Sequence, residues 1–463
     1  MTLPDIPWPL GSAEDTPPPS VAYVVRVKLH DIATWVVTND PDLPWVFYPT
    51  DPIGVLADPL TITRSVPQSD LWPLQPDPAT ATFTVVTPTA ADLADVKIGT
   101  RTSITYQSPP AAFSAVTEAF YGRVADVQIT PGEYLVGHDE DGAPIYYAAL
   151  HTITCVDYLA DLEDQVRWGV DYYSLSRPTA PITYLLEDFF DQAGMGDLVF
   201  EAYDGDTTPD SPWVRVPDDN TETGVREIIE TLLAQWALTG DSRGPARYVI
   251  DQNVDPTTGL PDPDQPYAMR LAFKNIDPAA DDYLDAPDPA HMTVIDAAHV
   301  DLGATAYTGR KFDAIRKVIT YPSPPGSAAW GVGLTRAAAS LSGTPGSTVK
   351  IATGITIDST YVGGGATGLL SDAQPWIDDL ADFYLPADVP RARYAADSFT
   401  WRLYAAPEGS FLPNLGDVLA VDGISAAWTP TGLTWFTGRL TGYTLTIATK
   451  RPTIDFTLRD VAS

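Results

Sequence analysis

Cysteine is almost absent from this sequence, and basic residues are few. A single cysteine, Cys155, occurs in 463 residues, so no disulfide can form within the chain. Its apolar strand pattern favours a small core residue over a catalytic thiol. Lysine and arginine number 27 against 61 aspartates and glutamates, a formal net charge of −34. Because phosphate-binding surfaces need clustered Lys and Arg, this balance argues against net binding to nucleic acids.

Long hydrophobic runs are absent too. No stretch approaches the about eighteen apolar residues that a membrane-spanning helix needs. The first residues, MTLPDIPWPLGS, lack a basic region followed by an apolar core, so we expect no secretory signal. We therefore expect a protein that works inside a cell or leaves it by lysis. Hydrophobic residues make up 44 % of the chain, which predicts a folded globular protein.

Patterns that carry catalysis are also missing. No histidine pair has the i, i+4 spacing of a metalloprotease helix; the histidines are His30, His138, His151, His291 and His299. His151 alternates with apolar neighbours, so we expect a packed or capping side chain. No GxSxG elbow occurs, and the glycine-rich residues 363–368 lack the lysine of a phosphate loop, which predicts a turn. Chance acid pairs are unavoidable among so many carboxylates. We therefore expect no enzyme, and no catalytic or cofactor-binding residue.

One stretch has the spacing of a calcium-binding loop. Positions 1, 3, 5, 7, 9 and 12 of that loop would be Asp251, Asn253, Asp255, Thr257, Gly259 and Asp262. Pro256, however, stands where the sharp turn needs glycine, and the flanks read as strands rather than helices. We favour a solvated hairpin tip over a calcium site and assign no metal ligand.

A strand pattern occurs twice, once near each end of the chain. In the first copy Gly122-Arg123 opens a strand that leads to an acidic hairpin tip and a returning strand. Near the C-terminus Gly438-Arg439 opens a similar strand. A further glycine precedes each pair, by 122 − 99 = 23 residues in one copy and 438 − 416 = 22 in the other. We predict two related units of antiparallel strands.

The copies differ in length. We align residues 82–86 with residues 399–403, and Asp157 and Asp460 close the two copies. Gly122 to Asp157 spans 35 residues and Gly438 to Asp460 spans 22, so the first copy is longer by 35 − 22 = 13. We place the extra residues in a hairpin tip between Gly132 and Tyr147, because surface turns tolerate insertions.

The predicted fold class is mainly β with an α+β insert, in which two repeated β-barrel-like domains flank a small α+β domain. Asp157 is a predicted helix cap, and after it the apolar residues recur at the spacing of a helix. We predict helices at 181–196 and 223–240, followed by a hairpin with strands at 246–250 and 267–274. The predicted division has five parts: an N-terminal arm and strands (1–59), the first β-barrel-like domain (60–164), the α+β insert (165–300), a connecting segment (301–392) and the second β-barrel-like domain (393–463). Within the connecting segment we predict a strand at 313–321, then a flexible loop, then a helix at 371–385.

Several short motifs occur in a characteristic order. They are FYGRV at 120–124, VDYLADL at 156–162, the helix-and-hairpin stretch 182–274, LGDVLAV at 415–421, FTGRL at 436–440 and FTLR at 456–459. Each alone is common, but their order and spacing resemble those of minor tail proteins of long-tailed, siphovirus-type phages that infect actinobacteria. The resemblance covers residues 60–463, and insertions at 138–145 and 251–265 depart from the shorter form.

That group is similar to the baseplate-hub proteins of phage tails and related injection machines. The resemblance implies two hub domains per subunit and a homotrimer forming a pseudo-sixfold ring, which joins the tail tube to the threefold tip. DNA would pass through the channel without specific binding. It also implies a place in the virion tail tip, assembly in the host cytoplasm, and contacts with distal tail or tube, tape-measure, tip or fibre proteins. It carries no catalytic residue, cofactor or metal ligand over to this chain.

Other classes of protein would show different features in the sequence. A receptor- or glycan-binding tail protein, the alternative that we keep, should show exposed aromatic loops and a separable C-terminal domain. Here the sequence ends on a strand of the repeat, and core patterning is predicted for Trp168, Trp236, Trp376 and Trp401. A cell-wall or capsule hydrolase should show a convergent acid pair or a metal site.

The acidic excess has a place in the hub interpretation. An acidic channel wall would repel DNA phosphates, whereas a basic one would slow transit. We expect the wall to carry a substantial part of the charge of −34. The candidate segments nearest the channel or a subunit joint are residues 138–142 and 204–222.

Overall fold

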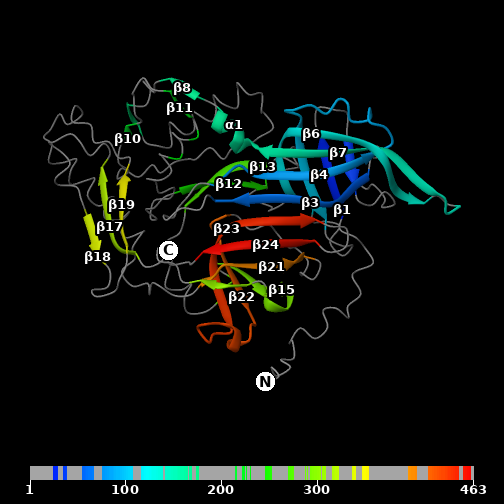
Figure 1. The fold of residues 1–463 in the computed structure, drawn as a ribbon. Helices are drawn as coiled ribbons and strands as arrows, with labels where there is room; N and C mark the ends of the chain where they lie inside the picture. The colour runs from blue at the N-terminus through cyan, green and yellow to red at the C-terminus, as the bar shows by residue number, and fades with distance from the viewer. Residues whose placement is uncertain are drawn as a thin grey trace.

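In the computed structural model, strands dominate, and the described part of the chain forms a large, mostly antiparallel sheet (Figure 1). The structure describes residues 24–29, 35–38, 55–66, 76–107, 116–138, 141–164, 292–303, 305–308, 395–403, 415–447 and 452–459, and short pieces between 166 and 353. Helix α1 (Tyr158–Asp164) begins after Asp157, whose Oδ1 accepts the N–H of Leu159 at 3.1 Å; this confirms the predicted cap. In these residues no helix is long and apolar enough to cross a membrane.

The main sheet is built from strands at both ends of the sequence. They are β1 (Val24–Leu29), β2 (Trp35–Thr38), β3 (Val55–Ser65), β4 (Thr80–Thr87), β5 (Arg101–Gln107), β6 (Val116–His138), β7 (Pro144–Asp157), β14 (Thr293–Asp296), β15 (Val300–Asp301), β21 (Ser398–Arg402), β22 (Val418–Asp422), β23 (Trp435–Ile447) and β24 (Thr453–Arg459). They form two barrels joined side by side.

The first barrel closes through hydrogen bonds all the way round. Its strands follow the order β3-β2-β1-β5-β6-β7-β4, and β4 pairs back to β3. Neighbours are antiparallel except β2 and β3, which meet at one parallel pair, Thr38 and Val55. Strands β1 and β2 therefore belong to this barrel, and β3 crosses residue 60, where we placed a domain boundary. The domain division itself stays a prediction.

The second barrel is closed by a single kinked segment. Its strands follow the order β14-β22-β23-β24-β21-β15. Strand β14 pairs with β22, and β15 pairs with β21 at the opposite edge. Between them lies only the short 3-10 helix η3 (Ala297–His299), capped by Asp296, whose Oδ1 accepts the N–H of Ala298 at 2.8 Å. The chain itself thus bridges the two edges of this sheet.

The two barrels share a central order of four strands. The order β5-β6-β7-β4 in the first corresponds to β22-β23-β24-β21 in the second. A bulge follows the Gly-Arg pair in both, between Val124 and Asp126 in β6 and between Leu440 and Gly442 in β23. The predicted pair of repeated β-barrel-like units is confirmed.

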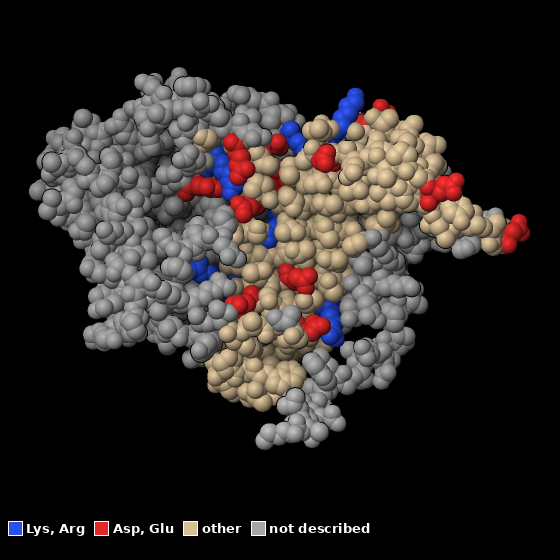
Figure 2. All heavy atoms as spheres, in the orientation of Figure 1, with Lys and Arg blue, Asp and Glu red and all other residues tan. Residues whose placement is uncertain are grey.

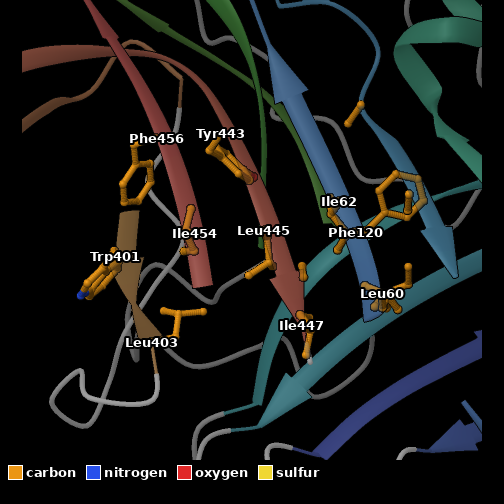
Figure 3. Close-up of a cluster of buried hydrophobic side chains, with 14 of the residues drawn as sticks. Leu60, Ile62, Phe120, Trp401, Leu403, Tyr443, Leu445, Ile447, Ile454 and Phe456 are labelled. Atoms are coloured by element: carbon orange, nitrogen blue, oxygen red, sulfur yellow. The ribbon is translucent and has the colours of Figure 1, made fainter. Parts of the chain in front are cut away.

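The buried side chains of the two barrels form one continuous cluster. Figure 3 shows them following one another across β21, β24, β23 and β3. Alternation explains the pattern, because every second residue of a strand faces the same side; on β24 the buried hydrophobic residues are Ile454, Phe456 and Leu458. The core therefore does not stop at the boundary between the barrels.

Outside the main sheet the described strands form small sheets. The predicted hairpin of the insert is confirmed as β12 (Ala246–Gln252) paired with β13 (Met269–Asn275). Two further pairs are β8 (Val166–Trp168) with β11 (Glu222–Gly224) and β9 (Ser174–Ser176) with β10 (Val214–Arg215). Of the predicted insert helices, 181–196 lies outside the described residues, and within 223–240 only Arg226 and Glu230 are described as helical.

The connecting segment holds a small sheet of its own. The predicted strand 313–321 is confirmed as β17 (Ile315–Pro322), which pairs with β18 (Arg336–Ala339) and β19 (Ser347–Thr353). Strand β18 lies inside residues 323–347, the predicted flexible loop. The prediction of a loop is therefore wrong for the residues of β18, because neighbouring β17 supplies the hydrogen bonds that a short alanine-rich run could not make alone. The predicted helix 371–385 lies outside the described residues.

Strands β6 and β7 continue beyond the first barrel as a two-stranded arm (Figure 1). The hairpin lies where we placed it, but its tip is shorter than the predicted span from Gly132 to Tyr147, because β6 runs to His138 and β7 starts at Pro144. Apolar residues pair across the arm, as Leu135 does with Tyr146, and such cross-strand pairs stabilise a ladder. The extra residues of the first copy therefore lengthen two strands rather than a loop.

Candidate functional site

The Gly-Arg pairs occupy equivalent places in the two barrels. Gly122 lies opposite Thr102 of β5, and Gly438 lies opposite Leu419 of β22. The upstream glycines correspond too. The N–H of Gly99 donates to Val124 O at 2.8 Å, and the N–H of Gly416 donates to Leu440 O at 2.7 Å.

Both upstream glycines adopt the left-handed conformation, with φ of 89° at Gly99 and 87° at Gly416. Residues with a Cβ rarely adopt this conformation. The turns before β5 and β22, the strands that pair with the two Gly-Arg strands, therefore require glycine, which explains why the sequence repeats this spacing.

Close backbone approach explains the glycines of the Gly-Arg pairs. A Cβ on Gly122 would lie 2.2 Å from Val156 O, and one on Gly438 would lie 2.9 Å from Leu458 Cδ1 and 3.3 Å from Arg459 O. Val156 and Arg459 are equivalent residues of the returning strands. Glycine is thus needed where the returning strand crosses tightly over the bulge.

The two arginines act locally. Arg123 Nε lies 3.2 Å from Asp161 Oδ2 of α1, and this ion pair ties the helix to β6. Arg439 Nη1 donates to the carbonyl oxygen of Gly416 at 3.0 Å and is buried. Both hold their own barrels together, which favours a fold role over ligand binding.

The structure corrects one alignment between the copies. Phe83 lies opposite Ile153 of β7, and Phe399 lies opposite Phe456 of β24. Phe83 therefore corresponds to Phe399, one residue away from the predicted match of residues 82–86 with 399–403. A one-residue slip would turn these buried rings to the other face of the strand, so pairing with the returning strand decides the register.

The barrels meet at a strand joint that the sequence patterns did not reveal. Residues 60–65 of β3 pair antiparallel with residues 442–447 of β23. Ile62 and Leu445 lie opposite each other and are both fully buried, and the hydroxyls of Thr63 and Thr444 approach to 3.4 Å. We call this contact the internal joint.

Residues considered for chemistry lie apart and are packed. His151 is buried with Nε2 at 2.9 Å from Thr87 Oγ1; burial lowers its pKa, against a smaller raising effect of Asp92. Burial raises the pKa of the Cys155 thiol to about 12, so it is no nucleophile at neutral pH. Trp401 is buried, as predicted.

No group of three or more His, Cys, Asp or Glu able to hold a metal ion occurs among the described residues. Residues 253–262 and 363–368 lie outside them.

A buried polar cluster joins the insert to the first barrel. Arg226 is 8 % exposed; its Nε donates to Glu230 Oε1 at 2.5 Å, its Nη2 donates to Pro76 O at 2.7 Å, and Nη1 contacts Glu163. Asp157 is fully buried, and burial raises its pKa to about 6, against smaller opposing effects of Arg64, two backbone N–H groups and Arg226. This cluster escaped the sequence patterns because its members come from distant segments.

The raised pKa of Asp157 gives a testable pH dependence. Because the folded state holds this proton more tightly than the unfolded chain, the carboxylate costs stability as pH rises from about 4 to about 7. The interval from 3.8 to about 6 corresponds to about 3 kcal/mol. Asp157→Asn keeps an oxygen for the N–H of Leu159, so its free energy of unfolding relative to the native protein should rise by up to that amount over this range, as urea titrations would measure.

Asp296→Asn is the matched control, since Asp296 also caps a helix but is exposed. Equal pH profiles for the two variants would show that burial of Asp157 is not the cause.

Charge is unevenly distributed over the described surface. Figure 2 shows acidic side chains along the arm and a face of the second barrel with few charges. Between Asp422 and Arg439 no residue is charged. Of the predicted acidic segments, Asp141 and Gly142 at the arm tip are exposed, and 204–222 lies almost wholly outside the described residues.

No protein-family model matches the sequence, and no curated protein sequence matches it either. Among solved structures, the fold is similar to a tail protein from Neisseria meningitidis, at 10 % identity and a TM-score of 0.49, over 95 % of this chain and 96 % of that one. It is similar to the 43 kDa tail protein of prophage MuSo2 from Shewanella oneidensis, at 12 % identity and a TM-score of 0.47, over 95 % and 99 %. A third similar structure is an E. coli component of the type VI secretion system, at 8 % identity and a TM-score of 0.35, over 87 % and 73 %. The structural neighbours of this chain are thus described as phage tail and type VI secretion proteins.

Proposed function

We propose that this protein is a structural hub of a phage tail tip, in which three copies form a pseudo-sixfold ring between the tail tube and a threefold tip. The observation that carries the proposal is the duplication: each chain holds two barrels built on the same order of four strands, held side by side by the internal joint. Three such chains would supply six equivalent barrels, as a sixfold-to-threefold adaptor requires.

The described chemistry supports a structural role. The arginines of the repeats bind their own barrel, and the buried histidine and thiol are packed side chains. The order of motifs, which resembles that of minor tail proteins of actinobacterial phages, supports a role in a tail. The proposed partners are further copies of this chain and neighbouring tail proteins, with DNA passing through the ring.

We propose that part of the excess of acidic side chains lines the channel. Repulsion from a wall of carboxylates acts over about 8–10 Å at physiological salt, enough to keep DNA from adhering within a narrow passage. The acidic arm tip is exposed and offers such charge.

The solution mass tests the ring. Three copies of a 49.9-kDa chain should give about 150 kDa by native mass spectrometry, with a ring of threefold outline in averaged electron micrographs. A monomer at micromolar concentration, or a dimer with twofold symmetry, would contradict the proposal. A higher-resolution reconstruction then tests the charge of the channel wall. A neutral or basic channel, with all acidic side chains on the outside of the ring, would refute the proposed acidic wall.

A further inference from the structure

We propose that copies of this chain join edge to edge, with strand β16 (Tyr307–Thr308) of one copy pairing antiparallel with the free edge of β6 in the next. This inference rests on the proposed ring and names the residues that close it. It follows from comparing the two barrels position by position.

The internal joint shows how a barrel of this kind receives a neighbour. On β23, residues 435–439 pair with β22, and residues 442–447, after the bulge, pair with β3 of the other barrel. The first part of β23 thus pairs within its own barrel, and the part after the bulge pairs with the adjoining barrel. Every residue of the joint that points inward is covered, as Leu445 and Ile62 are.

Within the described part of the chain, β6 offers the same edge without an occupant. The bulges align Asp126 with Gly442, so residues 126–131 correspond to residues 442–447. Up to Arg123, β6 pairs with β5, but beyond it β7 is the only described strand that pairs with β6. Ile129 occupies the place of Leu445, yet it is 44 % exposed where Leu445 is fully buried. An open apolar strand edge of this kind is a site for strand addition.

The second barrel carries the strand that would fill this edge. Val300 lies opposite Trp401, as Leu56 of β3 lies opposite Val85, and 300 − 56 = 244. Tyr307 lies opposite Ala396 of β20 (Ala395–Ala396), as Thr63 lies opposite Thr80, and 307 − 63 = 244. The described residues 305–308 are therefore the counterpart of residues 61–64 of β3.

The predicted register follows directly. Ile62 lies opposite Leu445 in the internal joint, so Ala306 should lie opposite Ile129. Both residues are exposed in the single chain. Tyr307 should then lie opposite Gln128, and Thr308 opposite Val127.

One chain cannot make this contact with itself. Strand β16 pairs with β20 at the second barrel, whereas the free edge of β6 belongs to the first barrel. In the main sheet the path from β6 to β21 of the second barrel runs through β7, β4, β3, β23 and β24. Each copy thus has one donor strand and one acceptor edge. A contact of this head-to-tail type closes into a ring when the rotation permits.

Charge favours a second copy as the occupant. Chains with a net charge of −34 repel each other, so they can approach only where carboxylates are sparse. The stretches 126–131, DVQITP, and 304–309, ATAYTG, contain a single charged residue, Asp126.

Cysteine cross-linking tests the joint at the level of one residue pair. Directly opposed residues in an antiparallel pair have Cα atoms about 4.5–5.5 Å apart, which suits a disulfide. On oxidation, the double variant Ile129→Cys with Ala306→Cys should give mostly covalent trimers on a non-reducing gel. A mixture of the two single variants should stop at dimers, because each chain then has one new cysteine. Native Cys155 is fully buried and should not react.

Two controls separate the joint from the ring. Gln128→Cys with Ala306→Cys should cross-link far less, since neighbouring residues on a strand face opposite sides. Ile129→Lys should weaken assembly at least tenfold by dilution, whereas Ile98→Lys, at a position 76 % exposed on the turn before β5, should not. A ring of the expected mass without the 129–306 cross-link would overturn this joint and leave the proposed function standing, and a monomer would overturn both.

Discussion

Replacing Gly122 by alanine is expected to destabilise the protein by about 3 kcal/mol or more. The added Cβ would lie 2.2 Å from Val156 O and 2.8 Å from the ring of Phe120. A backbone oxygen cannot rotate away as a side chain can, so the returning strand must shift and the core over it must repack. The free energy of unfolding, from urea titration followed by circular dichroism, measures this cost.

Gly438→Ala provides the matched comparison in the second barrel. There the nearest atom is Leu458 Cδ1 at 2.9 Å, the end of a flexible side chain, so a smaller loss is expected. Equal losses at the two sites, or native stability of Gly122→Ala, would show that close approach does not explain the repeated glycine.

Phe456→Ala is expected to cost about 3–5 kcal/mol. Phe456 is almost fully buried, and its ring centroid lies 5.0 Å from that of Phe399 and 6.2 Å from that of Trp401. Removing it leaves a cavity among rigid aromatic rings, which collapse poorly around a void. Thermal unfolding of the variant and of Phe456→Leu, which should lose much less, measures the effect.

The continuous core sharpens this prediction. Because the buried cluster runs through both barrels, Phe456→Ala should lower one shared transition rather than release the second barrel alone. Ile153→Ala, at the equivalent place in the first barrel, should lower the same transition. Two separate transitions, each sensitive to only one variant, would show that the barrels unfold independently.

Local pattern was sufficient for features that arise within a few residues. The left-handed glycines Gly99 and Gly416 and the alternation around them revealed the duplication, and Asp157 marked the start of α1. These signals depend only on backbone conformation and on which face of a strand is apolar.

The pairing of strands that lie far apart in the sequence could not be predicted from such local patterns. Alternation shows which face of β3 is buried but not that its far edge meets β23, and it allowed the one-residue error at Phe399, where apolar residues occur on both registers. The arm was missed because acidic and glycine residues near 138–142 are typical of turns, whereas the cross-strand pair of Leu135 and Tyr146 appears only once β6 and β7 are aligned. Arg226 joins the cluster at Asp157 from a separate helix, which no local period could predict.

The internal joint also dictates when the molecule can be completed during synthesis. Thr63 and Thr444 are separated by 381 residues, and a ribosome adds about 5–20 residues per second. The outer edge of β3 must therefore wait roughly 20–80 s for β23 to emerge. During this interval the nascent chain presents two open strand edges, one on β3 and one on β6, to other chains on the same messenger. Order of synthesis, and not affinity alone, then decides which β23 fills the edge of β3, because the chain's own β23 arrives tethered and at high local concentration.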